Sequence, residues 1–285
     1  MATISALYHY PVKGCAGIRV PTGTLGRAGL AHDRRFLVTD LAGTYRTQRR
    51  DPLLATVQPA LDAHPDADRL TLSAPGAGAV RVSIDTTAPR RPVTLFHDTY
   101  TGIDQGEEVA TWLTAVLGKP SRLVLAPPEH HRVTDGLTPG TSGYADSCPV
   151  HLLSTSSLRA LNARITANGA PPIPTDRFRP NIVVDDWEAH EEDHALRLTT
   201  GAVELGYAKP AIRCVVTTVD QLTGNRSGPE PLRTLATYRR TPDGVAFGAK
   251  YAVLQPGRIA VGDVLTTVER SEADLSGLTR TTVTP

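Results

Sequence analysis

The chain has 285 residues, enough for one large β-rich domain or two domains of ordinary size, each with a substantial core. Thirty Lys and Arg against 29 Asp and Glu leave a net charge of +1, so we expect no nucleic-acid partner and no attraction to an anionic membrane. Three widely spaced cysteines, Cys15, Cys148 and Cys214, indicate a reduced, cytoplasmic protein rather than a disulfide framework.

The first hundred residues predict short strands joined by turns. The N-terminus is typical of a strand rather than a secretory signal, and no run of about 18 apolar residues predicts a membrane anchor. A turn at Pro75–Gly78 joins two of the strands as a hairpin would. The segments rich in β-formers are Ile4–Tyr8, Phe36–Thr39, Leu54–Leu61, Arg69–Ser73 and Val80–Ile84. This pattern indicates an antiparallel barrel or sandwich.

Three helices are expected further along the chain. The apolar spacing predicts a helix over Gly106–Leu117, and a serine cap begins a second over Ser156–Asn168. Pro127–Pro149 shows neither the helical nor the strand period of apolar residues and is expected to be a loop. Pro231–Tyr238 is expected to form a short helix. Further strands are expected near Asn181–Val184, Leu196–Thr199, Val203–Leu205, Val215–Val219, Val245–Leu254 and Ile259–Val268. The fold class is therefore mainly β with a few helices (α+β), and a Rossmann fold is not expected.

Cys214 is the most informative residue. Arg213 directly before it, Pro210 upstream and the β-branched run Val215–Val219 behind it predict a thiol at the start of a strand, beside a fixed positive charge. A cation stabilises the thiolate, which is the form that acts as nucleophile or metal ligand. The alternative is that the residue only packs, since unpaired cysteine is among the most buried residue types.

Basic residues recur next to turns. Four of them lie next to a turn: Lys13, Arg34, Arg179 and Arg213. Taken one at a time, each would be expected on the solvated surface. If they converged on one site they would hold a phosphorylated, anionic cofactor. The segment Asp146–Pro149 would add hydroxyl and amide donors.

Several motifs in order resemble the MOSC family with its N-terminal β-barrel domain, the group that includes the amidoxime-reducing components. The matching segments are Tyr10–Lys13, Phe178–Val184, Arg213–Asp220, Thr223–Gly224, Pro229–Leu235, Tyr238–Arg239, Phe247–Gly248 and Val261–Asp263. The resemblance implies an N-terminal β-barrel-like domain over residues 1–125, a MOSC β-barrel domain over residues 126–270, and a C-terminal tail over residues 271–285.

The same resemblance implies a molybdenum cofactor, Mo-molybdopterin, with the Cys214 thiolate as the one protein ligand of the metal. The implied activity is a two-electron reduction that removes oxygen from a small N-hydroxylated substrate. The residues that the resemblance assigns to the cofactor are Lys13, Gly14, Arg34, Ser147, Cys148, Arg179, Ile212, Arg213, Cys214 and Lys250.

Asn181 and Asp220 are candidates for the substrate side of the site. Each has an alternative interpretation, a strand-edge turn for Asn181 and an Asx turn into Thr223–Gly224 for Asp220. Whether Thr47–Arg49 faces the site is left open by the sequence.

We expect neither the membrane anchor nor the iron–sulfur domain that some members of this family have, so electrons would come from a separate flavin, haem or iron–sulfur reductase. Two other functions stay open. One is a carrier of molybdenum cofactor or sulfur, as in the cofactor sulfurases, and the other is a β-barrel binding module with inert cysteines.

Overall fold

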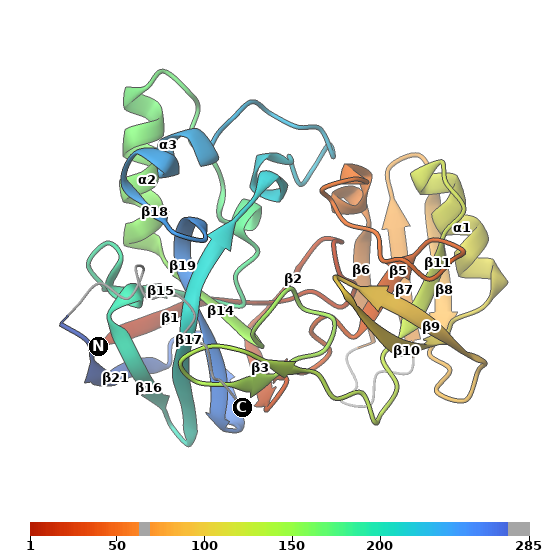
Figure 1. The fold of residues 1–285 in the computed structure, drawn as a ribbon, viewed down its shortest axis with the longest axis horizontal. Helices are drawn as coiled ribbons and strands as arrows, with labels where there is room; N and C mark the ends of the chain where they lie inside the picture. Colours follow the sequence, from red (N-terminus) through yellow and green to blue (C-terminus); the bar gives the residue numbers. More distant parts are fainter. Residues whose placement is uncertain (63–68, 273–285) are drawn as a thin grey trace.

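The computed structural model describes residues 1–62 and 69–272, and it shows two lobes side by side (Figure 1). Strands predominate, and three α-helices lie among the described residues, which confirms the mainly β class. No helix among those residues is long and apolar enough to cross a membrane. The expected tail, residues 271–285, lies outside the described residues from position 273 onward.

The larger lobe is built on a closed barrel of seven strands. Strands β14 and β19 pair with each other as well as with their other neighbours, and this pairing closes the sheet. In order around the barrel the strands are β14 (Val150–Ser154), β15 (Ile182–Asp185), β1 (Ala2–His9), β21 (Val264–Arg270), β16 (Ala195–Thr200), β17 (Val203–Arg213) and β19 (Gly244–Gln255). Alternate residues such as Leu152 and Tyr251 fill the interior.

The first strand of the chain is part of this barrel. Strand β1 pairs with β15 on one side and with β21 on the other, so the N-terminus closes a sheet made otherwise from the second half of the chain. Two short strands pair with barrel strands: β2 (Ile18–Val20) with β1, and β18 (Arg240–Thr241) with β19. A separate three-stranded sheet contains β20 (Gly257–Ala260), β3 (Thr22–Gly26) and β4 (Gly29–Leu30). A domain division at residue 125 stays a prediction, and the barrel includes residues on both sides of it.

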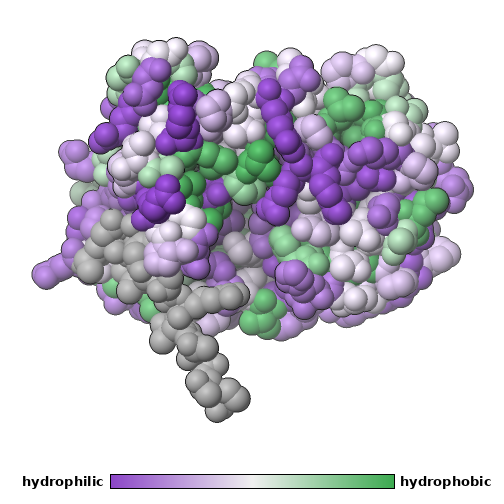
Figure 2. Space-filling view, turned by 45° about the horizontal axis from the view of Figure 1, so that its top comes forward, coloured by the Kyte–Doolittle hydropathy of each residue, from purple (hydrophilic) through white to green (hydrophobic). Residues whose placement is uncertain are grey.

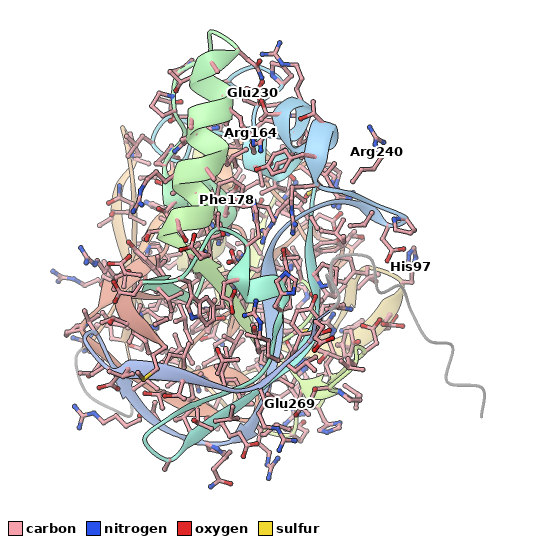
Figure 3. All side chains as sticks on the ribbon, turned by 90° about the vertical axis from the view of Figure 1, so that its left-hand side faces the viewer. His97, Arg164, Phe178, Glu230, Arg240 and Glu269 are labelled. Atoms are coloured by element: carbon pink, nitrogen blue, oxygen red, sulfur yellow. The ribbon has the colours of Figure 1, made fainter. Side chains whose placement is uncertain are left out.

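Two helices cover the outside of the barrel. Helix α2 (Thr155–Ala167) and helix α3 (Leu232–Tyr238) pack their apolar faces on the outward-facing residues of β14 and β19. Figure 3 shows Arg164 on α2 and Phe178 close to this helix, where it lies over the barrel. Ser154 caps α2, because its hydroxyl oxygen accepts a hydrogen bond from the Ser157 N–H.

The smaller lobe packs two sheets and helix α1 (Glu107–Leu117) around its own core. One sheet contains β5 (Phe36–Thr39), β11 (Arg122–Leu125), β10 (Asp98–Asp104) and β9 (Arg90–Leu95), and the other contains β6 (Gln58–Leu61), β7 (Arg69–Ala74) and β8 (Gly78–Ser83). The turn at Pro75–Gly78 joins β7 to β8, as predicted. The expected loop 127–149 contains only the two-residue strands β12 (Val133–Thr134) and β13 (Gly140–Thr141).

Two expected strands are wrong in part. Instead of a strand over Leu54–Leu61, the short helix η1 (Pro52–Thr56) precedes β6, because Pro52 is preorganised for the first helical turn. Instead of one strand over Ile259–Val268, β20 and β21 are separated at Gly262, where the positive φ of 96° turns the chain.

The expected strand over Val215–Val219 is also wrong. These residues form the short helix η4 (Val215–Thr218), because the hydroxyls of Thr217 and Thr218 donate hydrogen bonds to the carbonyls of Cys214 and Val215 at 2.9 and 2.8 Å. Local hydrogen bonds of this kind override β propensity. Two further short helices, η2 (Thr175–Phe178) and η3 (Glu191–Asp193), lie beside the barrel.

Candidate functional site

Cys214 lies where the long strand β17 ends and η4 begins, within hydrogen-bond reach of a residue of the smaller lobe, Arg49. Its thiol is partly exposed, whereas Cys15 and Cys148 are buried. Burial raises the pKa of Cys15 to about 12 and also raises that of Cys148, so neither is a thiolate at neutral pH. Of the three cysteines, Cys214 is therefore the one placed to act as a ligand.

The cation that touches this sulfur is Arg49, from the smaller lobe. Its Nη2 atom lies 3.5 Å from Cys214 Sγ and donates to it. Arg213, the sequence neighbour, faces the other way and donates to the carbonyls of Phe247 and Phe178 at 2.8 and 3.2 Å. The charge of Arg213 still interacts with Cys214, but the hydrogen bond to the sulfur comes from Arg49, because the strand directs alternate side chains to opposite faces.

Arg213 instead supports the site through His151. Its Nη2 atom donates to His151 Nε2, and burial, with the charge of Arg213, holds the pKa of His151 well below its usual value. The imidazole is therefore neutral and accepts at Nε2. Burial also lowers the pKa of Arg213 to about 10. Three of its five N–H groups make these contacts, which leaves two for a bound group.

Arg34 and Arg179 converge on the ring of Tyr10. Their guanidinium carbons lie 4.1 and 4.3 Å from the ring centroid, and Arg34 Nη2 donates to the Arg179 carbonyl at 3.3 Å. Asp33 pairs with Arg34 at 2.6 Å. The Nη2 atom of Arg179 is buried without a hydrogen-bond partner. A buried charged donor with no partner is costly, so this atom is available to an anion.

Lys13, Asp146 and Lys250 complete the arrangement. Lys13 is buried, with 7% of its side chain exposed, and forms an ion pair with Asp146, whose side chain is 76% exposed. Lys13 holds the pKa of Asp146 far below its usual range. Burial lowers the pKa of Lys250 to about 8, and the charge of Asp146 opposes that shift. An incoming anion could therefore replace the exposed carboxylate at Lys13.

We call these cations the basic cluster: Lys13, Arg34, Arg49, Arg179, Arg213 and Lys250. Two carboxylates, Asp33 and Asp146, accompany the six cationic side chains. Hydrophilic residues gather over the middle of one face, between the lobes, as Figure 2 shows. No three His, Cys, Asp or Glu side chains among the described residues could together hold a metal ion. The donors fit an anionic, phosphorylated cofactor whose metal takes one thiolate ligand.

The two substrate-side candidates are engaged with the protein itself. Asn181 is 2% exposed, and its amide joins β14 to β1 by accepting from the His151 N–H and donating to the Tyr8 carbonyl. Asp220 Oδ1 accepts from the N–H groups of Leu222 and Thr223 in an Asx turn, and its Oδ2 accepts from Arg177. Both side chains hold backbone in place around the site.

The remaining candidates border the basic cluster. Gly14 follows Lys13, and its carbonyl accepts a 2.6 Å hydrogen bond from Gln48 Nε2. Ser147 is partly buried beside Cys148, whose thiol donates to the Asp135 carbonyl. Ile212 is 37% exposed at the end of β17. Their contact with a cofactor stays a prediction.

Sequence reasoning left Arg49 undecided and did not identify Tyr10, His151 or the carboxylate of Asp146 as parts of the site. The available signals were local: Tyr10 directly precedes the Pro11–Lys13 motif, and Asp146 begins the Asp146–Pro149 motif. His151 had no such signal, because its role depends on Arg213, 62 positions away.

Comparison with known proteins places the chain. Residues 1–120 match the MOSC N-terminal beta barrel domain and residues 139–266 match the MOSC domain. Mitochondrial amidoxime-reducing component 1 of Homo sapiens is 33% identical over 284 residues, which cover 92% of this chain and 82% of that protein. Mitochondrial amidoxime reducing component 2 of Rattus norvegicus is 34% identical over 286 residues, with the same coverage of each chain.

A third relative is the molybdenum cofactor sulfurase of Danio rerio, which is 30% identical over 287 residues, 92% of this chain and 33% of that protein. The motif order, the closed barrel and these matches agree with one another. The chain belongs to the MOSC family, with a MOSC N-terminal β-barrel domain followed by a MOSC domain.

Proposed function

We propose that the protein is a molybdenum cofactor-dependent reductase of N-hydroxylated compounds such as amidoximes and hydroxylamines. The observation that carries the proposal is that the basic cluster gathers around Asp146, with Arg49 bonded to the partly exposed thiol of Cys214 and the buried Arg179 Nη2 atom left without a partner. Relatives that cover most of the chain are named for amidoxime reduction.

Different residues of the site would bind different parts of the cofactor. Arg34 and Arg179, stacked on Tyr10, are placed to bind phosphate oxygens, since a planar guanidinium fits them with two parallel hydrogen bonds. Lys13 would hold a further anionic oxygen as a point charge once Asp146 moves away. Cys214 would supply the thiolate ligand. When bound, the cofactor would supply a metal centre that takes up two electrons and leaves open positions for oxygen.

The reaction consumes two protons as well as two electrons: R₂N–OH + 2e⁻ + 2H⁺ gives R₂N–H + H₂O. Lys250 is a suitable proton source, because burial lowers its pKa to about 8 and its ammonium is still protonated at neutral pH. In the ligand-free protein Asp146 stays ionised, because Lys13 holds its pKa low, and its negative charge favours the protonated form of Lys250.

The two electrons would come from a separate protein of the flavin, haem or iron–sulfur class. The basic cluster binds and orients groups but contains no side chain that supplies electrons in this reaction. A reductase of this kind therefore needs a partner for each turnover.

A carrier of molybdenum cofactor or sulfur is the second candidate. It is favoured by the sulfurase relative, of which the chain matches one third. A carrier needs the same anion-binding residues, and its cysteine would hold sulfur or bind the cofactor without turnover. The two functions therefore differ in catalysis rather than in binding.

The deciding experiment is expression with cofactor supply, followed by metal analysis and an amidoxime assay with chemically reduced protein. The reductase predicts roughly one molybdenum per chain and reduction of the amidoxime. Fully loaded protein that does not reduce N-hydroxylated compounds would favour the carrier. Protein that binds neither metal nor pterin would exclude both functions.

Cys214→Ser tests the ligand directly. The variant should lose molybdenum or activity, because a serine hydroxyl is a harder and less acidic ligand than a thiol. Cys15→Ala is the matched control: it removes a thiol that is buried in the apolar core of the smaller lobe, and the variant should keep its metal. Equal metal content and activity in Cys214→Ser and the parent would contradict the assignment.

A further inference from the structure

The segment that carries Arg49 is held against the loop that follows the candidate ligand. Gln48 and Gln221 exchange hydrogen bonds through their amides, at 3.0 and 3.1 Å. Arg226 Nη2 donates to the Arg49 carbonyl at 2.5 Å. Farther along, the backbone of Gly224 lies against Leu53, so closely that a Cβ on Gly224 would sit 3.2 Å from Leu53 Cα. We call this set of contacts between residues 48–53 and residues 219–227 the clasp.

The clasp is attached to Cys214 at its other end. Loop 219–227 begins directly after η4, and a bridge between Val219 and Arg226 closes the loop. The backbone of Arg49 is therefore tied to the element that follows the thiol, although the two residues are 165 positions apart. The Arg49 side chain is exposed, so its position over Sγ depends on this backbone attachment rather than on packing.

We infer that Arg49 is a positioning residue of the site, whose guanidinium holds the Cys214 sulfur and is itself held over it by the clasp. The inference deepens the proposed function and rests on it only for the role of the sulfur as a metal ligand. The N-terminal lobe thereby supplies a residue to the centre of the MOSC domain's site.

The chemical consequence concerns the metal. A sulfur that accepts a hydrogen bond from a guanidinium donates less electron density to a metal, and hydrogen bonds to ligand sulfurs tune reduction potentials. Arg49 would therefore raise the reduction potential of the bound metal and make electron uptake from a partner easier. Removing the side chain should lower the potential even where the metal is retained.

The first test needs no cofactor. Cys15 and Cys148 are buried, so Cys214 is the accessible thiol, and its alkylation can be followed with iodoacetate, which is anionic, and iodoacetamide, which is neutral. A positive charge at about 4 Å from the sulfur favours the anionic reagent by on the order of fivefold. In Arg49→Gln the ratio of the two rates should fall by about that factor.

Arg50→Gln is the matched control. It removes the same charge from the next residue, whose guanidinium donates to the Tyr45 carbonyl rather than to the thiol. The ratio should stay near the parent value in Arg50→Gln and recover in part in Arg49→Lys, which restores the charge without the planar fork. An equal ratio in Arg49→Gln and Arg50→Gln would overturn the inference.

Arg226→Ala tests the clasp, because it leaves Arg49 intact but releases its carbonyl. The ratio should fall part of the way toward that of Arg49→Gln, and an unchanged ratio would mean that the clasp does not hold the guanidinium. In cofactor-loaded protein, Arg49→Gln should lower the reduction potential of the metal. Failure of metal uptake in the parent would defeat the proposed function alone, since the alkylation ratio does not depend on the cofactor.

Discussion

Arg179 illustrates how a single residue can be costly to the ligand-free protein and useful to the site. It adopts a left-handed backbone conformation with φ of 56°, and burial lowers the pKa of its guanidinium. One Nη2 atom has no partner, although hydrogen bonds to charged groups contribute about 1.5–3 kcal/mol each. A binding site accounts for such a residue, because the missing partner is then the ligand.

Arg179→Gln should therefore weaken cofactor retention. Loss of a charge-assisted contact of about 1.5–3 kcal/mol corresponds to a decrease in affinity of on the order of tenfold to a hundredfold. The measurement is molybdenum per chain after dialysis. Arg159→Gln, on the exposed face of α2, is the control and should retain the parent's content. Equal retention in the two variants would contradict a cofactor role for Arg179.

Because Lys250 is buried, we expect the free energy of unfolding to depend on pH. Burial lowers its pKa from 10.5 to about 8 in the folded protein, so between those pH values the unfolded chain binds more protons than the folded one. Stability contributed by this group therefore rises as pH increases from about 8 to 10.5. Below pH 8 the buried charge destabilises the ligand-free protein to its full extent.

Lys250→Met should accordingly raise the free energy of unfolding at pH 7, by about 1–3 kcal/mol. The gain over the parent should shrink as pH rises from 8 to 10.5, because the parent lysine then loses its charge. Urea unfolding of both proteins across this range measures the difference. A gain that does not change with pH would show that packing rather than charge is responsible.

Helix α2 is anchored at its first turn by a buried carboxylate. Glu192 is fully buried and accepts hydrogen bonds from the Ser154 and Ser157 hydroxyls at 3.0 and 2.9 Å, and from the Ser154 N–H at 3.3 Å. Burial raises the pKa of Glu192, and the hydrogen bonds from these serines oppose that rise. The cap thus joins α2 to η3 and to the barrel strand β14, which ends at Ser154.

Ser154→Ala should destabilise the protein by about 1–3 kcal/mol, because it removes the cap and one donor to a buried carboxylate. Thermal unfolding followed by circular dichroism measures the loss. Ser83→Ala, an exposed serine at the end of β8, should change stability by less than about 0.5 kcal/mol. Equal effects of the two substitutions would show that the cap contributes nothing.

Strand β19 approaches His151 so closely that one position requires glycine. Gly248 has φ of 77°, and a Cβ there would lie 2.7 Å from His151 Nε2 and 2.9 Å from the Leu152 carbonyl oxygen. Gly262 also has a positive φ, 96°, but has open space around it. Substitution of Gly262 therefore introduces backbone strain alone, whereas substitution of Gly248 adds a steric clash with His151 and Leu152.

Gly248→Ala should cost more stability than Gly262→Ala, which should lose about 1 kcal/mol from backbone strain alone. It should also displace His151 and Arg213 and so lower cofactor retention, whereas Gly262→Ala should not. Chemical unfolding and metal content measure the two effects. Similar losses of stability in both variants would contradict the close approach.

At the scale of the whole molecule, the barrel is complete only with the first strand of the chain. Without β1, the edges of β15 and β21 would expose unpaired backbone groups and the interior residues Ile4 and Leu7 would be missing. A fragment of residues 126–272 should therefore show no cooperative thermal transition. A parent-like transition and near-ultraviolet circular dichroism of that fragment would show that the barrel closes without β1.

The predictable part of the fold lay in regular segments. Alternation and apolar spacing located β5, the β7–β8 hairpin and helix α1, because these patterns arise from each element's own burial. The failures have local causes that compete with propensity: threonine hydroxyls turn the β-branched residues after Cys214 into η4, and Pro52 starts a helix where a strand was expected. Short edge strands such as β3 have no apolar period and were not predicted.

The sequence by itself determined the candidates for the chemistry, Cys214 and five of the six members of the basic cluster, because a thiol, its flanking motifs and recurrent basic residues are properties of local order. Only the tertiary structure decided how they meet. Lys13 pairs with Asp146 across 133 positions, and Arg49 rather than Arg213 reaches Cys214 across 165. Contacts at such separations depend on how the two lobes pack and which face each strand presents, and neither is written in any single segment of the chain.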